Sequence, residues 1–311
     1  MLDKQSDQAM QIYRIPFHAM ACACEVVIAA ADQQQMFAIA QEAIAEVRRI
    51  EVKYSRYRDD SMVSRINAQA GGQAVECDEE TWSLLDYADA LYAASDGLFD
   101  ITAGILRRAW DFRSKHLPAQ EELQALCEKI GWNKVERGEQ SLRLPQAGME
   151  IDFGGFGKEY AADRAAAILQ ERGTVHAYLN LGGDIRVLGP KPDGTAWIMG
   201  IQDPRQTGKI VASIPLREGA LATSGDYEKY FEVEGQRYCH ILNPHSGLPV
   251  RRWRSISVLA PLTSVAGSCT TIAMLKEADA LAYLDAQGMR YLAIDQHGEM
   301  HMQRPGVSTA G

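Results

Sequence analysis

The chain has 311 residues, with 32 Lys and Arg against 41 Asp and Glu, so its formal net charge is −9. Hydrophobic residues make up 46% and charged residues 23% of it, a balance typical of globular proteins and not of disordered or fibrous ones. A protein that neutralises nucleic-acid phosphates usually carries a basic face, so the acidic surplus argues against nucleic acid as a partner.

The cysteines and the apolar runs bear on the cellular compartment. Six thiols in a chain this long do not resemble a secreted disulfide scaffold, and only Cys22 and Cys24 are close in sequence. The N-terminus has no apolar core of signal-peptide length, and no run approaches the roughly 18 apolar residues that span a bilayer. We therefore expect a cytoplasmic protein without a membrane partner, although a trimmed leader would leave the same sequence.

The N-terminal part predicts an extended segment followed by a helix. Residues 12–30 are rich in β-branched and aromatic residues, which favour extended structure. Asp32 followed three residues later by Gln35 is the arrangement of a capping box, so a helix is expected over 33–54. Apolar residues recur at helical spacing from Phe37 onward, which places Phe37 on the buried face of this helix.

The central part predicts two further helices, one strand and a glycine-rich turn. One helix is expected after Asp78 and another over 119–130, and each ends before a glycine. Residues 149–153 predict a short strand. The glycines that follow this strand lead into a helix from Lys158 to about Arg172.

The C-terminal part is mostly β-like. From 175 to 260, apolar runs alternate with Gly, Pro and Asp turn signals, which predicts a series of strands. Two helices over 264–276 and 277–287 and a last strand over 289–295 are expected to follow.

These elements predict the α+β class, with mixed or antiparallel sheets and flanking helices. No repeat, linker or break in composition divides the chain, so we expect a single intertwined unit over residues 12–300. Residues 1–11 and 301–311 are expected to be flexible tails.

The familiar nucleotide-binding motifs do not occur. Gly155 and Gly157 form Gly-x-Gly, but position 160 is Tyr, so the dinucleotide-binding pattern is incomplete. His240 and His245 stand without a third His close in sequence, which argues against a zinc site.

Four Gly-rich polar turns stand out instead. The segment 154–158 places backbone N–H groups and an ammonium at the start of a helix, where phosphate oxygens bind readily. The other three turns lie at 180–184, 223–227 and 240–247. One such turn commonly serves backbone geometry alone, but four of them indicate a site for a small phosphate-containing molecule.

Six segments carry a more specific signal. They are SRYRDDSMVSRIN (55–67), SDGLFDITAG (95–104), MEIDFGGFGKEYAAD (149–163), NLGGD (180–184), ATSGDY (222–227) and HILNPHSG (240–247). Their sequences and their order resemble the flavin transferases, that is, the FAD:protein FMN transferases of the ApbE family. The resemblance runs from about Met20 to Ile294.

The resemblance implies a transferase that cleaves the pyrophosphate of FAD, attaches FMN through a phosphoester to a Thr or Ser of a target protein, and releases AMP. It implies FAD as the substrate, Mg²⁺ as the cofactor and an acceptor protein as the partner. The chemistry needs a cation, because the negative charge on a pyrophosphate repels nucleophiles.

The resemblance also assigns residues to roles. His240 matches the catalytic histidine, and the carbonyl of Gly157 and the side chain of Thr271 match two magnesium ligands. The residues that fall in FAD-binding segments are Met20, Tyr57, Leu98, Phe99, Asp100, Lys158, Tyr160 and Ile241. An imidazole with an ordinary pKa near ~6.5 is suited to accept the proton of an incoming hydroxyl. The alternatives are that His240 bonds its own turn, that Tyr57 is a core aromatic and that Thr271 only begins a helix.

The sequence departs from the family pattern at three places. Gly267 stands where a carboxylate normally precedes Thr271 by four residues, which removes the charged magnesium ligand. Glu159 replaces the glycine that commonly follows the lysine, and it adds negative charge beside the expected phosphate site. Ala21 and Cys22 replace the usual Gly-Thr after the methionine.

Gly267 leaves two other functions open. One is a non-catalytic FAD-binding protein, for which Gly267→Asp is expected to create Mg²⁺-dependent release of AMP. The other is a metal-dependent FAD pyrophosphatase, which yields FMN and AMP without any acceptor protein.

Overall fold

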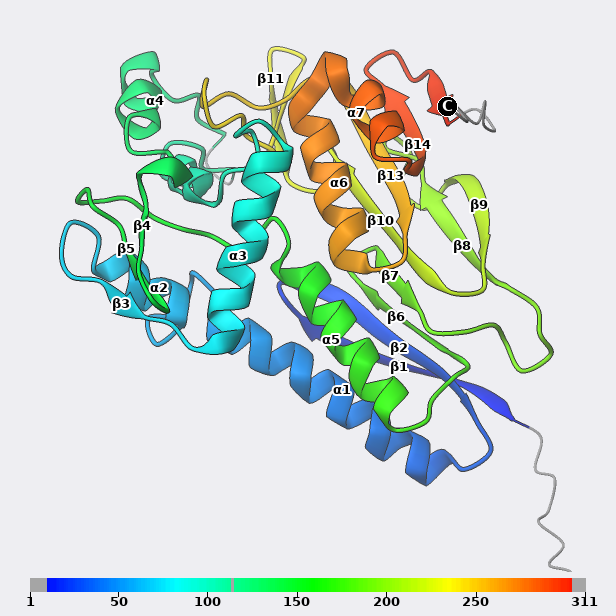
Figure 1. Cartoon of the computed structure of the whole chain (residues 1–311). Helices are drawn as coiled ribbons and strands as arrows, with labels where there is room; N and C mark the ends of the chain where they lie inside the picture. Colours follow the sequence, from blue (N-terminus) through cyan, green and yellow to red (C-terminus); the bar gives the residue numbers. More distant parts are fainter. Residues whose placement is uncertain (1–9, 113–114, 304–311) are drawn as a thin grey trace, which may run out of the picture.

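The computed structural model describes residues 10–112 and 115–303. Within these residues, an eight-stranded sheet forms the centre of the molecule, and its strands lie in the order β1-β2-β6-β7-β10-β13-β14-β15 (Figure 1). Each neighbouring pair is antiparallel. The strands of this sheet are β1 (Gln11–Ala19), β2 (Cys22–Ala30), β6 (Ala177–Leu181), β7 (Asp184–Val187), β10 (Gly219–Gly225), β13 (Trp253–Ala260), β14 (Arg290–Asp295) and β15 (Met300–Met302).

The predicted extended segment 12–30 is a tight hairpin. Ala19 pairs with Cys22, so Met20 and Ala21 alone form the turn between β1 and β2. Both have left-handed backbones, with φ of 54° and 58°. Sequence reasoning did not locate this turn, because neither residue is the Gly, Asn or Asp that usually marks such a conformation.

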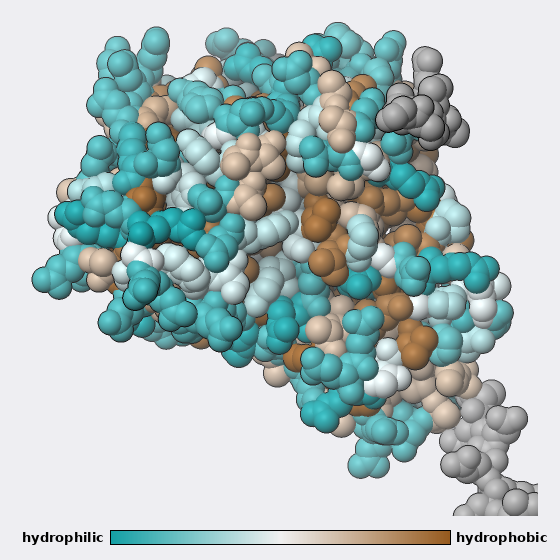
Figure 2. Space-filling view, viewed as in Figure 1, coloured by the Kyte–Doolittle hydropathy of each residue, from teal (hydrophilic) through white to brown (hydrophobic). Residues whose placement is uncertain are grey.

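Three long helices cover one face of the sheet. They are α1 (Gln33–Tyr54), α5 (Gly157–Glu171) and α6 (Thr263–Lys276), and they cross in front of the strands in Figure 1. The Asp32 side chain accepts a hydrogen bond from Gln35 N at 3.0 Å, as the capping pattern predicts. Phe37, however, is 52% exposed, and Met36 takes its expected place in the core. Figure 2 shows that hydrophobic side chains on this face gather around α6 and the strands beside it.

The opposite face of the sheet is covered by a hairpin of β8 (Trp197–Gln202) and β9 (Ile210–Leu216). Side chains alternate along β2 accordingly. Val26 and Ile28 pack in the core with α1 and α5, whereas Val27 packs in a separate core with Trp197 and Met199. The middle strands of the sheet are therefore buried on both faces, whereas most residues of the edge strands β1 and β15 are exposed or half-buried.

The remaining helices and strands surround the central sheet and the three helices that cover it. The helices are α2 (Met62–Ala68), α3 (Glu79–Ala94), α4 (Gln120–Cys127) and α7 (Ala280–Ala286), with 3₁₀ turns η1 (Ile101–Arg108), η2 (Trp132–Lys134) and η3 (Glu277–Asp279). The strands are β3 (Val75–Glu76), β4 (Glu136–Arg137), β5 (Ser141–Arg143), β11 (Tyr230–Val233) and β12 (Gln236–Cys239). The predicted α+β class with antiparallel sheets and flanking helices is confirmed.

Two local predictions are wrong. Residues 149–153 form no strand, because their backbone groups bond elsewhere: Ile151 N and O bond the side chain of Asn67, and Asp152 N bonds the Ile101 carbonyl. The turn expected at 223–227 begins later, since β10 continues to Gly225.

The central sheet extends into both of the predicted tails. β1 begins at Gln11, inside the expected N-terminal tail, and β15 extends to Met302, inside the expected C-terminal one. The rest of both predicted tails, residues 1–9 and 304–311, lies outside the described residues. Among the described helices, none is long and apolar enough to cross a membrane.

Candidate active site

A cavity of about 560 Å³ opens where segments far apart in the sequence meet. Its walls come from the β1–β2 turn, the C-terminal end of α1, residues 98–107, the start of α5, the end of β10, residues 240–242 and α6. The predicted site residues that line it are Met20, Tyr57, Leu98, Phe99, Asp100, Gly157, Lys158, His240, Ile241 and Thr271.

Tyr160 is the predicted residue that the structure does not bring to the cavity. Its ring is partly buried against the core, and its hydroxyl donates to Glu80 Oε1 at 2.9 Å. Tyr160 lies three residues after the first residue of α5, and its hydroxyl is used by this bond with α3. It is therefore a contact between helices and not part of the cavity wall.

Tyr57 is not a core aromatic. Its side chain is 77% exposed at the cavity mouth, where its hydroxyl accepts a hydrogen bond from Arg107 Nη1 at 3.1 Å. An exposed ring whose orientation is fixed by one hydrogen bond can stack on a planar ligand.

Asp100 is committed to the protein's own structure. Its Oδ1 accepts hydrogen bonds from Thr102 N and Oγ1, and its Oδ2 accepts one from Trp132 N at 2.9 Å. Asp100 thus caps η1 and anchors the loop before η2. Phe99 is 4% exposed, and its ring lies so close to Gly155 that a Cβ there would come within 2.8 Å of it. Both residues shape the cavity wall.

The N-terminus of α5 faces the cavity without a side-chain cap. Phe156 occupies the N-cap position and makes no capping hydrogen bond. Gly157 and Lys158 then line the cavity. The Gly157 N–H donates to the Phe153 carbonyl, so the N–H group of Lys158 is the one in this turn that is available to an anion. Lys158 itself forms an ion pair with the buried Asp184, which raises the pKa of the lysine despite its burial. Much of its charge is therefore already offset.

His240 stands at the cavity wall as a neutral imidazole. Burial lowers the pKa of His240 to about 4, and the positive charges of Arg107 and Lys229 act in the same direction. Its backbone N–H donates to the Lys229 carbonyl, whereas Nδ1 has no hydrogen-bond partner among the described residues. The pKa of His240 in the free protein therefore departs from the ordinary imidazole value on which the sequence analysis relied. The ring can accept a proton throughout the neutral range.

Thr271 belongs to a group of hydroxyls between α6 and β10. Ser224 Oγ lies 2.8 Å from Thr270 Oγ1 and 3.3 Å from Thr271 Oγ1. Thr270 in turn donates to the Gly267 carbonyl at 2.8 Å. Thr270 is fully buried and holds the helix, so Thr271 and Ser224 are the hydroxyls that reach the cavity.

Sequence reasoning missed several charged residues of the cavity. Among the described residues, six carboxylates and four cationic side chains line it: Glu51, Asp100, Asp152, Glu159, Asp184 and Glu228, with Arg56, Arg107, Lys158 and Lys229. Arg56 and Arg107 lie in or near the recognised segments, and their charge was a usable signal. Lys229 lies two residues after the third turn, 223–227, and nothing in its sequence context marks it. The cavity lining, like the whole chain, therefore has more carboxylates than cationic side chains.

Cys22 is a thiol of the cavity wall whose pKa is lowered. Its Sγ lies 3.6 Å from Cys24 Sγ, and this hydrogen bond lowers the pKa of Cys22 to about 7. The ammonium of Lys158 also favours the Cys22 thiolate.

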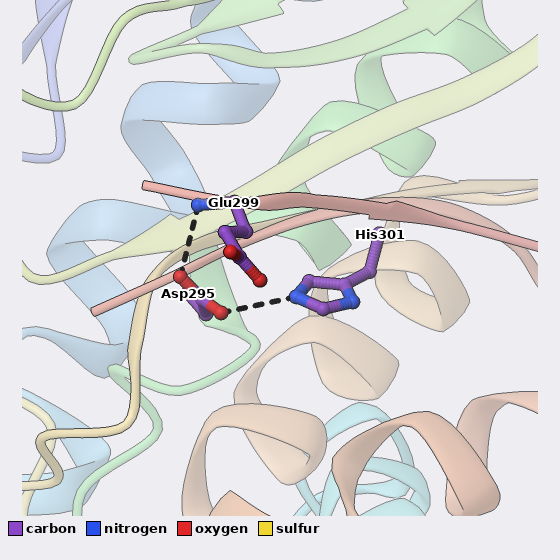
Figure 3. Close-up of side chains that lie close together, drawn as sticks. All are labelled: Asp295, Glu299 and His301. Carbon is purple, nitrogen blue, oxygen red and sulfur yellow. Dashed lines mark hydrogen bonds and ion pairs between the residues drawn. The ribbon is translucent and has the colours of Figure 1, made fainter. Parts of the chain in front are cut away.

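A second group of metal-binding side-chain types lies on the β14–β15 hairpin, where Asp295, Glu299 and His301 come together (Figure 3). Asp295 Oδ1 accepts hydrogen bonds from the backbone N–H groups of His297 and Glu299, and Oδ2 lies 3.1 Å from His301 Nε2. The group is thus accounted for by the turn it stabilises.

Comparisons with known proteins identify the family and agree with the fold. A family model described as the ApbE family matches residues 20–293. The FAD:protein FMN transferase of Treponema pallidum is 30% identical over 256 residues, covering 76% of this chain and 71% of its own. That of Vibrio cholerae is 31% identical over 250 residues, covering 77% of this chain and 74% of its own.

Solved structures show the same architecture. The crystal structure of the ApbE protein of Thermotoga maritima matches with a TM-score of 0.86 and 31% identity, over 94% of this chain and 97% of that one. The apo flavinyl transferase ApbE of Pseudomonas stutzeri matches with a TM-score of 0.84 and 26% identity, over 95% and 96%. The family predicted from six short segments is confirmed, and the chain belongs to the ApbE family.

Proposed function

We propose that this protein is an FAD:protein FMN transferase. The observation that carries the proposal is the single cavity in which His240, Thr271, Tyr57 and the open N-terminus of α5 meet. The relatives that bear this activity in their names cover most of the chain, which supports the same conclusion.

The cavity suits the two halves of FAD differently. Tyr57 offers an exposed ring for stacking, and Met20, Leu98 and Ile241 provide apolar wall beside it. The pyrophosphate fits the N-terminus of α5, where backbone N–H groups favour anions. Arg107 and Lys229, both close enough to lower the pKa of His240, add positive charge on that histidine's side of the cavity.

The reaction is the transfer of a phosphoryl group from one oxygen to another. The acceptor Thr or Ser oxygen forms a bond to the FMN phosphorus, and the bond from that phosphorus to the bridging oxygen breaks, so AMP leaves with that oxygen. His240, neutral and unpaired at Nδ1, receives the proton of the acceptor hydroxyl. The bound pyrophosphate offsets the charges of Arg107 and Lys229, which raises the basicity of the ring when it is needed.

The donor set fits magnesium. The Thr271 hydroxyl and the Gly157 carbonyl are hard oxygen ligands at the cavity wall, and Glu159 presents a buried carboxylate oxygen, Oε2, without a partner among the described residues. These residues would hold Mg²⁺, whose charge would stabilise the negative charge of the pyrophosphate during transfer. The excess of carboxylates over cations in the cavity is a second reason to expect a divalent cation there.

The cellular setting is part of the same proposal. The six cysteines are free, and five of them have raised pKa values, which suits a reducing compartment. We place the protein in the cytoplasm, acting on an acceptor protein that presents a Thr or Ser.

The decisive experiment incubates the purified protein with FAD, Mg²⁺ and an acceptor protein of a characterised member of the family. A covalent fluorescent band together with AMP is expected. If FAD binds normally but neither product forms, the protein is a flavin-binding protein and the proposal is wrong. A parallel reaction without acceptor identifies a pyrophosphatase, because that activity yields free FMN and AMP.

A further inference from the structure

Two departures from the family pattern meet in space. Gly267 lies in α6 and Glu159 lies in the first turn of α5, far apart in the sequence. A Cβ on Gly267 would lie 2.5 Å from Glu159 Cγ and 2.9 Å from Glu159 Oε1. The space that a side chain at 267 would occupy is therefore filled by the side chain of Glu159.

The Glu159 carboxylate is buried and only partly satisfied. Glu159 is 7% exposed, and its Oε2 has no hydrogen-bond partner among the described residues. Among the described residues, the ammonium beside it is that of Lys158, which is already paired with Asp184. A buried carboxylate with an unpaired oxygen costs free energy unless a cation or a proton joins it.

Glu159 also lies next to both predicted magnesium ligands. Gly157 precedes it by two residues in the first turn of α5. Thr271 follows Gly267 by four residues, so the two share one face of α6 a single turn apart. The carboxylate packed against Gly267 thus lies one helical turn along α6 from Thr271, and Gly157, Glu159 and Thr271 all line the cavity.

We propose that Glu159 supplies the carboxylate ligand of the divalent cation, in place of the acidic residue that Gly267 has replaced. The carboxylate ligand then comes from α5 and not from α6. Gly267 has no side chain, and this leaves the room that the Glu159 side chain occupies. The number of carboxylates at the metal is unchanged, which removes the reason for expecting a non-catalytic protein. This inference rests on the proposed function only in that it needs a divalent cation at this point of the cavity.

If Glu159 is the ligand, Gly267→Asp alone is not expected to improve metal binding. A new side chain at 267 would overlap Glu159 and would set two carboxylates against each other. The double variant Glu159→Gly with Gly267→Asp instead returns the carboxylate to α6 and empties the space on α5.

The test measures metal binding directly, with Mn²⁺ followed by electron paramagnetic resonance, alone and in the presence of ADP. Glu159→Gln is expected to weaken Mn²⁺ binding about tenfold or more, since it keeps the shape and removes the charge. Glu159→Gly is expected to be as weak, and the double variant is expected to recover to within about threefold of the unaltered protein.

Glu228→Gln is the control variant, because it removes another carboxylate that lines the same cavity but does not contact Gly267. Its Mn²⁺ affinity is expected to change less than threefold, whereas a general effect of cavity charge would weaken it as much as Glu159→Gln. Thermal unfolding gives a second measurement: Mg²⁺ with ADP should raise the midpoint of the unaltered protein and the double variant, and not that of Glu159→Gln.

The outcomes separate the two proposals. If Glu159→Gln binds Mn²⁺ like the unaltered protein, or if the double variant stays as weak as Glu159→Gly while folded, Glu159 is not the ligand. Flavin transfer by the unaltered protein would then still stand. If Mn²⁺ binding follows the carboxylate but no flavin is transferred, the metal site is correct and the enzyme function is wrong.

Discussion

At the scale of single residues, His240 carries the most chemistry. Its surroundings keep the free imidazole neutral, with burial and two cations lowering its pKa to about 4. A ring with so low a pKa is a weak base until an anion arrives. The bound pyrophosphate is that anion, so the basicity of His240 is coupled to the presence of substrate.

Removal of this ring should separate binding from chemistry. We expect His240→Ala to leave FAD affinity within a few-fold and to lower flavin transfer by ~10²-fold or more, the usual scale for losing a general base. Fluorescence titration gives the first quantity and covalent flavin on the acceptor gives the second. Unchanged turnover would show that His240 only bonds its own turn.

The depressed pKa of His240 also predicts a pH dependence of stability. Between about pH 6.5 and pH 4 the unfolded histidine binds a proton that the folded one does not, so the free energy of unfolding falls as the pH falls. Because one edge of the ring faces the cavity, we expect a loss on the order of 2 kcal/mol. Urea unfolding across this range should show the loss in the unaltered protein and not in His240→Asn; parallel curves for the two would contradict the assignment.

Cys22 predicts a selective chemical reactivity. Its pKa is lowered to about 7, whereas the pKa values of the other five cysteines are raised. At pH 7, iodoacetamide should therefore label Cys22 first, and bound FAD should protect it because Cys22 lines the cavity. Peptide mass spectrometry reads the site. Equal labelling of Cys127, the other partly exposed cysteine, would contradict the prediction.

At the scale of elements, the turn between β1 and β2 is strained. Ala21 adopts a left-handed backbone, which costs an L-residue roughly 1–2 kcal/mol, and the family commonly has glycine there. Ala21→Gly should stabilise the protein by about 0.5–1 kcal/mol after the larger unfolded-state entropy of glycine is subtracted.

Ala23 provides the control for this substitution. It is exposed on β2, two residues further on, in a regular strand. Ala23→Gly should destabilise the protein, so the two alanines should respond with opposite signs in the midpoint of chemical denaturation. Destabilisation by both would mean that the turn carries no strain that glycine relieves.

The helices and strands also differ in how well the sequence alone predicts them. Helices with caps, such as α1 after Asp32, were predicted with their limits, because the capping bond is local. The segment 149–153 was misread as a strand, because its partner, the side chain of Asn67, is distant in the sequence. The site residues came from the resemblance, and periodicity could not have placed them together. The contact between Glu159 and Gly267 could not be predicted from the sequence, because each residue taken alone is only a difference from the family pattern.

At the scale of the whole molecule, a chain with a net negative charge has to bind a substrate that is also negatively charged. The formal charge is −9, and the described cavity residues carry six carboxylates against four cations. Lys158 is paired with Asp184, and Arg56 with Glu150 and Asp152, so the cations that remain for a pyrophosphate are few. A dianionic ligand should therefore bind well only when a divalent cation accompanies it.

This balance predicts how FAD stabilises the fold. The cavity lies where the core of α1 and α5 meets the core of β10, β13 and α6, so a ligand bound there holds both together. FAD with Mg²⁺ at 100 times its dissociation constant should add about 2.7 kcal/mol, seen as a rise of several degrees in the calorimetric midpoint. FAD with EDTA should add much less. Riboflavin, which has no phosphate, should stabilise equally in Mg²⁺ and in EDTA, because only the pyrophosphate needs the metal. Equal stabilisation by FAD in Mg²⁺ and in EDTA would show that the protein's own cations suffice.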